Sequence, residues 1–114
     1  MAAGVEANWK ELDRTTAVVS LAGELDLAGV GDLEPPINER LRRSSLIVDI
    51  SDLEFIDSAG LRVLYSAQRA AKASRRGFAV VHGSASAVTS FLELIRASSQ
   101  IPLFSSIAAA KASL

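Results

Sequence analysis

The sequence predicts an α/β fold: a single domain, residues 1–114, with a mixed, largely parallel β-sheet of about five strands and about four helices in the order ββαβαβαβα. Short aliphatic runs alternate along the chain with amphipathic helical patterns, which is typical of parallel strands joined by right-handed crossovers. The chain has 114 residues, of which 49% are hydrophobic. A chain of this length is long enough for one packed core and too short for two.

The first two strands are expected to form a hairpin. Residues 5–12 alternate imperfectly, residues 13–15 suit a tight turn, and residues 17–21 are short and apolar. Residues 23–26, Gly-Glu-Leu-Asp, are then expected to leave the sheet. The two glycines within residues 29–31 indicate a loop, and without a following G-x-x-G spacing they are a weak signal for phosphate binding.

A first helix is indicated by apolar residues at helical spacing, namely Leu33, Ile37 and Leu41. Pro35-Pro36 interrupts this pattern, and proline is tolerated in the first turn of a helix but costly further in. The regular helix is therefore expected to begin near Glu34. Ser44-Ser45 is expected to end it.

The stretch that follows predicts a buried strand, a short acidic turn and the start of a second helix. Residues 46–50 are aliphatic and β-branched, as a core strand should be. Asp57 or Ser58 can cap the helix by accepting a hydrogen bond from a free amide of its first turn. Gly60 keeps that turn slim. The result is a serine hydroxyl at a helix N-terminus, where free amides and the helix dipole favour an anion.

The second helix is expected to run over residues 58–76 and to end at Gly77. Its inner face is Leu61, Leu64, Ala67 and Ala71, and its outer face is Arg62, Arg69, Lys72 and Arg75. Residues 78–82 predict a buried strand, and Ser84 to Ser86 lead into a helix. The apolar face of that helix is Val88, Phe91, Leu92 and Ile95. Residues 101–104 predict an edge strand, after which Ser105 or Ser106 caps a final helix.

Two segments carry a family resemblance. Asp57-Ser58-Ala59-Gly60 directly follows a buried strand, and Gly23-Glu24-Leu25-Asp26 follows the preceding hairpin. In this order and spacing, they resemble the STAS domain of bacterial anti-sigma factor antagonists. The family often carries a second Ser or Thr directly after the switch serine, and this chain has Ala59 there, so one rival hydroxyl is absent.

The resemblance implies a function and a set of site residues. The unphosphorylated protein would bind and sequester an anti-sigma factor, commonly a serine kinase with a histidine-kinase-like ATPase fold, and so free a sigma factor for transcription. The kinase would phosphorylate Ser58 and release the complex, and a phosphatase would reset the switch. The residues expected to contact the partner are Gly23, Glu24, Asp26, Asp57, Ser58, Ala59, Gly60 and Arg62.

Composition argues against several other classes. A formal net charge of -1 argues against a broad surface for nucleic acid or an anionic membrane. The chain has no cysteine and a single histidine, His82, so neither a metal site nor another cofactor is expected. No basic N-terminal region precedes an apolar run and no stretch approaches ~20 apolar residues, so a cytoplasmic domain is expected, by default a monomer.

Three alternatives stay open. Ser58 can be a plain helix cap, as most serines before helices are. Asp57 either caps the helix, or it orients the Ser58 hydroxyl or faces a basic group on the kinase. The chain can instead be a STAS-type subunit of a lipid- or anion-transport assembly without a kinase-driven switch. A small α/β enzyme using Ser58 and His82 is the third. We expect no enzyme, because Ile56 stands where a G-x-S-x-G nucleophile elbow needs glycine, and a P-loop is absent.

Overall fold

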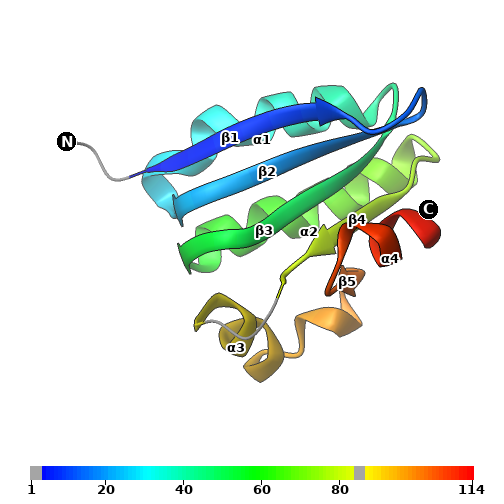
Figure 1. Cartoon of the computed structure of the whole chain (residues 1–114). Helices are drawn as coiled ribbons and strands as arrows, with labels where there is room; N and C mark the ends of the chain where they lie inside the picture. The colour runs from blue at the N-terminus through cyan, green and yellow to red at the C-terminus, as the bar shows by residue number, and fades with distance from the viewer. Residues whose placement is uncertain (1–3, 84–86) are drawn as a thin grey trace.

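The computed structural model describes residues 4–83 and 87–114. Within these residues five strands form one sheet in the spatial order β1-β2-β3-β4-β5 (Figure 1). Their bounds are β1 Val5–Glu11, β2 Thr16–Leu25, β3 Ser45–Ile56, β4 Phe78–Val81 and β5 Leu103–Phe104. The β1–β2 pair is antiparallel and the other neighbouring pairs are parallel, so the predicted hairpin and the largely parallel sheet are confirmed.

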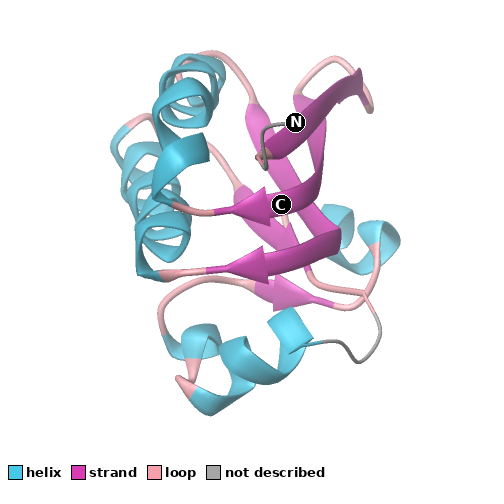
Figure 2. Cartoon of the chain, turned by 90° about the vertical axis from the view of Figure 1, so that its left-hand side faces the viewer, coloured by secondary structure: helices cyan, strands magenta, loops and turns pink. Residues whose placement is uncertain are grey.

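The helices of the described residues cover both faces of this sheet. They are α1 Leu27–Leu41, α2 Ser58–Ala73, α3 Ala87–Leu94 and α4 Ile107–Ala112, with one 3-10 turn, η1, at Ala97–Ser99. Figure 2 shows α1 and α2 on one face of the sheet and the short α4 on the other. α3 lies beyond the β4–β5 edge of the sheet (Figure 1). The predicted order ββαβαβαβα is confirmed.

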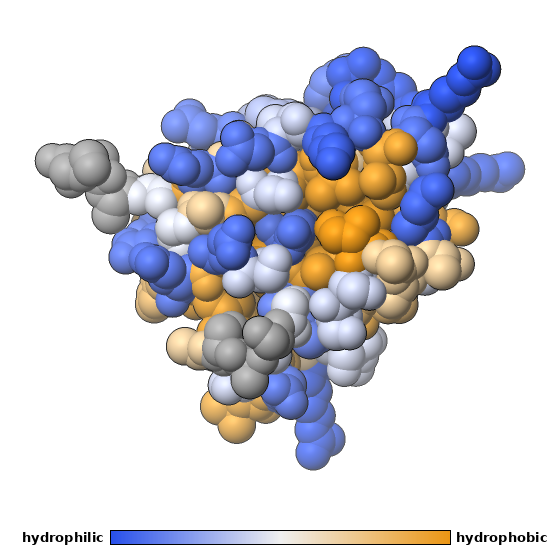
Figure 3. Space-filling view, in the orientation of Figure 1, coloured by the Kyte–Doolittle hydropathy of each residue, from blue (hydrophilic) through white to orange (hydrophobic). Residues whose placement is uncertain are grey.

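Side-chain alternation along the central strands divides the core between the two faces. Val19 and Val48 belong to the larger apolar cluster, together with α1 and α2, whereas their neighbours Val18 and Ile47 pack with α4. Figure 3 views the α4 side, where the visible apolar side chains gather beside that helix and polar side chains cover most of the remainder. The sheet and the α1–α2 layer therefore fix where the first turns of these two helices lie.

Strands β2 and β3 extend further than the sequence predicts. Residues 23–25 do not leave the sheet, and the acidic residues 51–56 are strand rather than turn, since Leu25 pairs with Ile56. The reason lies in two register shifts: β3 advances from Asp49 to Asp52 while β2 advances only from Ser20 to Ala22, and a second shift follows Gly23. Each inserts an extra residue into β3.

These bulges hide the strand pattern in the sequence. The buried residues of this part of β3 are Ile50, Leu53 and Ile56, which recur every third residue instead of every second. Such a spacing does not match the alternation expected of a half-buried strand. The segment between them therefore looks like a turn in the sequence.

Helix α1 begins about two turns earlier than predicted. Asp26 is its N-cap, so the expected loop at residues 29–31 is helical and both prolines lie inside the helix. Pro35 and Pro36 are on the exposed side, where the backbone carbonyls that lose their helical partners face water. The predicted inner face of Leu33, Ile37 and Leu41 is buried, as expected.

Helix α2 begins at Ser58 as predicted but ends at Ala73 without using Gly77 as its cap. Arg75 adopts the left-handed conformation, with φ 57°, and the amide of Arg76 donates to the carbonyl of Ala71 at 2.8 Å. This is a Schellman end with arginine where glycine is usual. Gly77 instead packs closely against the end of the chain, since a Cβ there would lie 2.7 Å from the tip of the Leu114 side chain.

Smaller predictions near the C-terminus have mixed outcomes. Ser106 caps α4 by accepting from the amide of Ala109 at 3.1 Å, and β5 is an edge strand, as predicted. Ile95 was expected to face inward, yet it is 37% exposed beyond the end of α3. The serine lead-in at residues 84–86 lies outside the described residues.

Candidate functional site

Two strand-to-helix junctions lie next to each other at the carboxyl-terminal end of strands β2 and β3. β2 and β3 are parallel neighbours, and their last residues, Leu25 and Ile56, are paired. Each strand is followed by an aspartate that caps a helix. The Asp26 carboxylate accepts from the amide of Ala28 at 3.1 Å, and the Asp57 carboxylate accepts from the amide of Gly60 at 3.0 Å. Two helix N-termini and two carboxylates therefore share one surface.

Gly60 allows the first turn of α2 to approach the end of β2. A Cβ at this position would lie 2.4 Å from the backbone oxygen of Leu25 and 2.9 Å from the side chain of Ile56. Any L side chain here would therefore push α2 away from the sheet. The amide of Asp57 also donates to the Leu25 carbonyl, at 3.3 Å, which ties the two junctions together. The close approach predicted from the sequence is thus present.

Ser58 is the first residue of α2, and its side chain is exposed. The amides of Leu61 and Gly60 both donate to Asp57, one to its carbonyl and the other to its carboxylate. Among the described residues, the amides of Ser58 and Ala59 have no partner, so they remain available as donors. The hydroxyl is therefore accessible at a helix end whose dipole and free amides favour negative charge.

An open cavity of about 540 Å³ begins at Ser58 and extends to α3. Its polar lining comes from Glu54, Asp57 and Ser58. Its apolar lining comes from Phe55 and Ile56 at the end of β3 and from Ala87, Val88 and Phe91 on α3. We call this cavity the β3–α3 groove. Sequence reasoning missed it, although Phe55 between acidic residues at the end of a strand is an unusual place for an exposed aromatic side chain.

Among the other predicted site residues, some lie near the two junctions and one has a backbone role. Glu24 stands opposite Phe55 at the end of β2, and Arg62 is exposed on α2, one turn beyond Ser58, so both are near the junctions. Gly23 has a backbone role instead: it lies at a register shift with φ +93°, and a Cβ there would lie 2.3 Å from the carbonyl oxygen of Gly4.

His82 lies away from Ser58. Asp49 pairs with Val81, so His82 is level with Ile50 in the middle of β3 rather than with its carboxyl end. It does not line the β3–α3 groove. Its Nδ1 is buried and has no hydrogen-bond partner among the described residues, and its carbonyl accepts from the Thr89 hydroxyl at 3.2 Å. The pocket uniting Ser58 and His82 that a hydrolase would need is therefore not formed.

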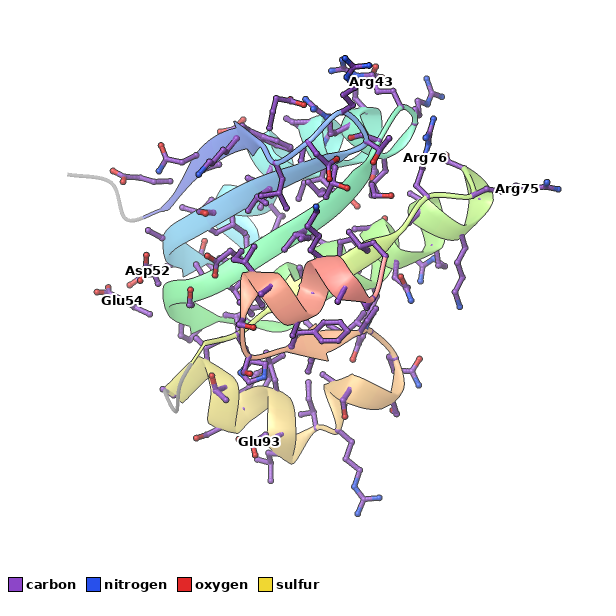
Figure 4. The ribbon with its side chains drawn as sticks, turned by 45° about the vertical axis from the view of Figure 1, so that its right-hand side comes forward. Arg43, Asp52, Glu54, Arg75, Arg76 and Glu93 are labelled. Atoms are coloured by element: carbon purple, nitrogen blue, oxygen red, sulfur yellow. The ribbon has the colours of Figure 1, made fainter. Side chains whose placement is uncertain are left out.

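Charges are separated along the strands. Asp52 and Glu54 project from the end of the sheet that carries Ser58, whereas Arg43, Arg75 and Arg76 project from the opposite end (Figure 4). In residues 4–83 and 87–114, the ion pairs lie elsewhere: Arg40–Glu11, Arg42–Glu39 and Lys111–Asp13. Among the described residues, the acidic side chains at the site end therefore form no ion pair.

The described part of the chain contains no group of side chains with the arrangement of a metal site, and none of its helices is long and apolar enough to cross a bilayer.

A family model described as "Mlab, STAS domain" matches residues 10–103, which is most of the chain. The chain belongs to the STAS domain family. The family expected from the Asp57–Gly60 and Gly23–Asp26 segments is therefore confirmed.

One relative of this chain has a named function. The anti-sigma-F factor antagonist RsfB of Mycobacterium tuberculosis is 40% identical to this STAS domain over 50 residues. The match covers 42% of this chain and 41% of RsfB, so it spans less than half of either protein. It places the STAS domain near a protein that is named for its action on an anti-sigma factor.

Solved structures share the fold over nearly the whole chain. An anti-sigma factor antagonist from Mycobacterium paratuberculosis matches with a TM-score of 0.81 and 23% identity, over 96% of this chain and 92% of that one. Unphosphorylated SpoIIAA matches with a TM-score of 0.72 and 17% identity, over 95% and 96%. Phosphorylated SpoIIAA from Bacillus gives 0.68 and 18%, over 96% and 100%. At these identities the likeness concerns the fold, and it confirms the predicted α/β architecture.

Proposed function

We propose that this STAS domain is an anti-sigma factor antagonist, a regulatory binding protein and not an enzyme. Its unphosphorylated form binds an anti-sigma factor that is also a serine kinase of the histidine-kinase-like fold, and so frees a sigma factor for transcription. Phosphorylation of Ser58 releases the complex, and a phosphatase restores the binding form. The proposed setting is the cytoplasm, and the free protein is a monomer.

The observation that carries this proposal is the position of Ser58. Its exposed hydroxyl stands at the N-terminus of α2, directly after the capping Asp57 and before the small Ala59. A kinase active site needs an accessible hydroxyl with little bulk around it. A helix end with two free amides can then accept the added phosphate without unfolding. The named function of RsfB and the phosphorylated form of SpoIIAA, which has this fold, add support.

Transfer of the phosphoryl group supplies a reason for release. The Ser58 oxygen bonds to the γ-phosphorus of ATP, the bond from that phosphorus to the β–γ bridging oxygen breaks, the hydroxyl proton passes to a base, and ADP leaves. A phosphoserine adds roughly -1.5 to -2 charges at neutral pH. Before ADP departs, this phosphoserine faces the ADP phosphates, and it follows Asp57 at the end of the sheet that also carries Glu24. Two unit charges ~4 Å apart at an effective dielectric of ~20 repel by about 4 kcal/mol.

The test compares Ser58→Ala and Ser58→Asp with the wild type. The anti-sigma factor is first recovered with the wild-type protein from an extract of the source cells, identified by mass spectrometry and purified. We expect Ser58→Ala to stay bound when ATP is added. We expect Ser58→Asp to bind roughly 30-fold more weakly or worse. Half of the repulsion given above is ~2 kcal/mol, and each ~1.4 kcal/mol is a factor of ten in affinity. Calorimetry measures the affinity.

Circular dichroism and thermal melts of the same proteins provide the control, because both variants should retain the wild-type fold. Equal affinity of Ser58→Asp and wild type, or a loss of binding that follows from unfolding, would contradict the charge mechanism. Phosphate mapped by mass spectrometry to a serine other than Ser58 would contradict the assignment of the site. Stable recovery of a transporter subunit in place of an anti-sigma factor would favour a role in a transport assembly.

A further inference from the structure

The β3–α3 groove joins an apolar surface to the acidic end of the molecule. Phe55 is 47% exposed on one wall, and Ala87 is exposed on the other. Ile56 and Val88 are only 5% and 3% exposed, so the packing around their side chains holds them in place at the base of the groove. Phe91 is half-buried against the main core. An apolar side chain that enters this groove would therefore meet a preformed surface. It would cover Phe55 with little loss of conformational entropy.

The charges around the groove restrict what can enter it. Glu54 and Asp57 line the groove itself, and Asp52 projects from the same end of β3 (Figure 4). None of the described residues that line it is basic. Covering these carboxylates with a neutral or acidic surface would strip their water without a replacement, which costs free energy. A segment that carries lysine or arginine beside its apolar side chain would instead pair with them.

We infer that the β3–α3 groove is the docking site for a segment of the anti-sigma factor in which an apolar side chain is flanked by lysine or arginine. The apolar side chain packs between Phe55 and α3, and the cationic side chains face Glu54 and Asp52. This inference rests on the proposed function and adds a second contact to it. Ser58 borders the same groove, so docking there holds the kinase active site close to the hydroxyl that it phosphorylates.

Docking in the groove and release at Ser58 depend on different residues, so each can be altered without the other. Docking depends on Phe55 and Glu54, neither of which is modified, whereas release depends on the phosphate at Ser58. Removal of the Phe55 ring should therefore weaken the unphosphorylated complex without altering the fold, because Phe55 is about half exposed and does not belong to the buried core. Phosphorylation of Phe55→Ala should slow at low kinase concentration and recover when the kinase is raised, since Ser58 itself is unchanged.

The experiment measures affinity for the purified anti-sigma factor recovered with the wild-type protein. We expect Phe55→Ala and Glu54→Lys each to weaken binding roughly tenfold or more, as central interface residues do. Leu94→Ala is the matched apolar control, since Leu94 lies on α3, is 81% exposed and does not line the groove. Glu39→Lys is the matched charge control on the exposed side of α1. Both controls should bind within about twofold of wild type, the usual effect of residues outside an interface.

Photocrosslinking identifies the occupant directly. Benzoylphenylalanine in place of Phe55 should crosslink to one segment of the anti-sigma factor, and the crosslinked peptide should contain an apolar residue with lysine or arginine beside it. An acidic peptide, or none, would overturn the inference. So would wild-type affinity of Phe55→Ala in a complex that Ser58→Asp still disrupts, and in that case the proposed function would stand. Failure of the wild type to bind any anti-sigma factor would overturn both.

Discussion

Gly60 is a residue at which helix α2 and the sheet approach closely. Its missing Cβ would lie 2.4 Å from the Leu25 carbonyl oxygen, which is backbone and cannot turn aside. We therefore expect Gly60→Ala to lower the free energy of unfolding by about 1–3 kcal/mol, the usual range for overpacking. Denaturant unfolding followed by circular dichroism measures the change.

Gly31→Ala is the control for this prediction, because Gly31 is also helical and a Cβ there would have no neighbour within 4 Å. It should raise the free energy of unfolding by about 0.5–1 kcal/mol, since alanine loses less conformational freedom than glycine on folding. If both variants change stability in the same direction, packing at Gly60 is not the cause.

Asp13 joins the turn between β1 and β2 to helix α4. Its carboxylate accepts from the amide of Thr15 at 2.8 Å and lies 3.1 Å from the Lys111 ammonium. The hydrogen bond from the Thr15 amide, followed by the one from Lys111, lowers the pKa of Asp13 from 3.8 to about 2. A depressed pKa means that Asp13 stabilises the fold above its unfolded pKa, and that this stabilisation is lost as pH falls from about 4 to about 2.

We therefore expect the Asp13 carboxyl to titrate with a midpoint near pH 2 in an NMR titration. Asp13→Asn should reduce the loss of stability over the same pH range, and added salt should reduce the effect further because the group is exposed. A midpoint at the ordinary value of 3.8 would contradict the contacts seen with Thr15 and Lys111.

At the scale of an element, the prolines of α1 stand inside a regular helix. Pro35 and Pro36 have no amide to donate to the carbonyls of Gly31 and Asp32. Replacing both with alanine should restore these hydrogen bonds and raise the free energy of unfolding by about 1–3 kcal/mol. Thermal melts of the double variant measure the gain. Pro102→Ala, outside the helices, should give no such gain, and a loss of stability in the double variant would mean that the helix needs its prolines.

Elements with a regular pattern could be predicted from the sequence, and elements with an interrupted one could not. The aliphatic run before Asp49 and the inner face of α1 follow their periods, so both were found. The end of β3 was missed because its bulges move the buried residues to every third position. The start of α1 was missed because glycines and prolines oppose a helix locally, whereas the Asp26 cap and the packing of Val30 against the core favour it.

The candidate site divides along the same line. Asp57, Ser58 and Gly60 lie within four residues of one another, so a cap, an exposed hydroxyl and a slim turn could be predicted together. The β3–α3 groove could not, because Phe55 and Phe91 come from segments that are far apart in the chain. Only the crossover through β4 brings α3 beside the end of β3.

The whole molecule is nearly neutral, yet its charge is strongly polarised along the strands. The formal net charge is -1, while Figure 4 places Asp52 and Glu54 at the end bearing Ser58 and Arg43, Arg75 and Arg76 at the other. Such a distribution produces a field that orients an approaching partner even when the net charge is small. A partner with a cationic docking segment would thus be drawn to the acidic end.

This polarity predicts how fast the proposed complex forms in salt. Raising NaCl from about 50 to about 500 mM should lower the association rate constant of unphosphorylated protein and anti-sigma factor by roughly tenfold, because the Debye length shrinks severalfold. The dissociation rate should change much less, because apolar contact at Phe55 is not screened. Stopped-flow fluorescence measures both rates. Asp52→Asn with Glu54→Gln should flatten the salt dependence, whereas Arg75→Gln with Arg76→Gln, at the far end, should leave it nearly unchanged. Equal slopes for the two double variants would mean that the acidic end does not guide the encounter.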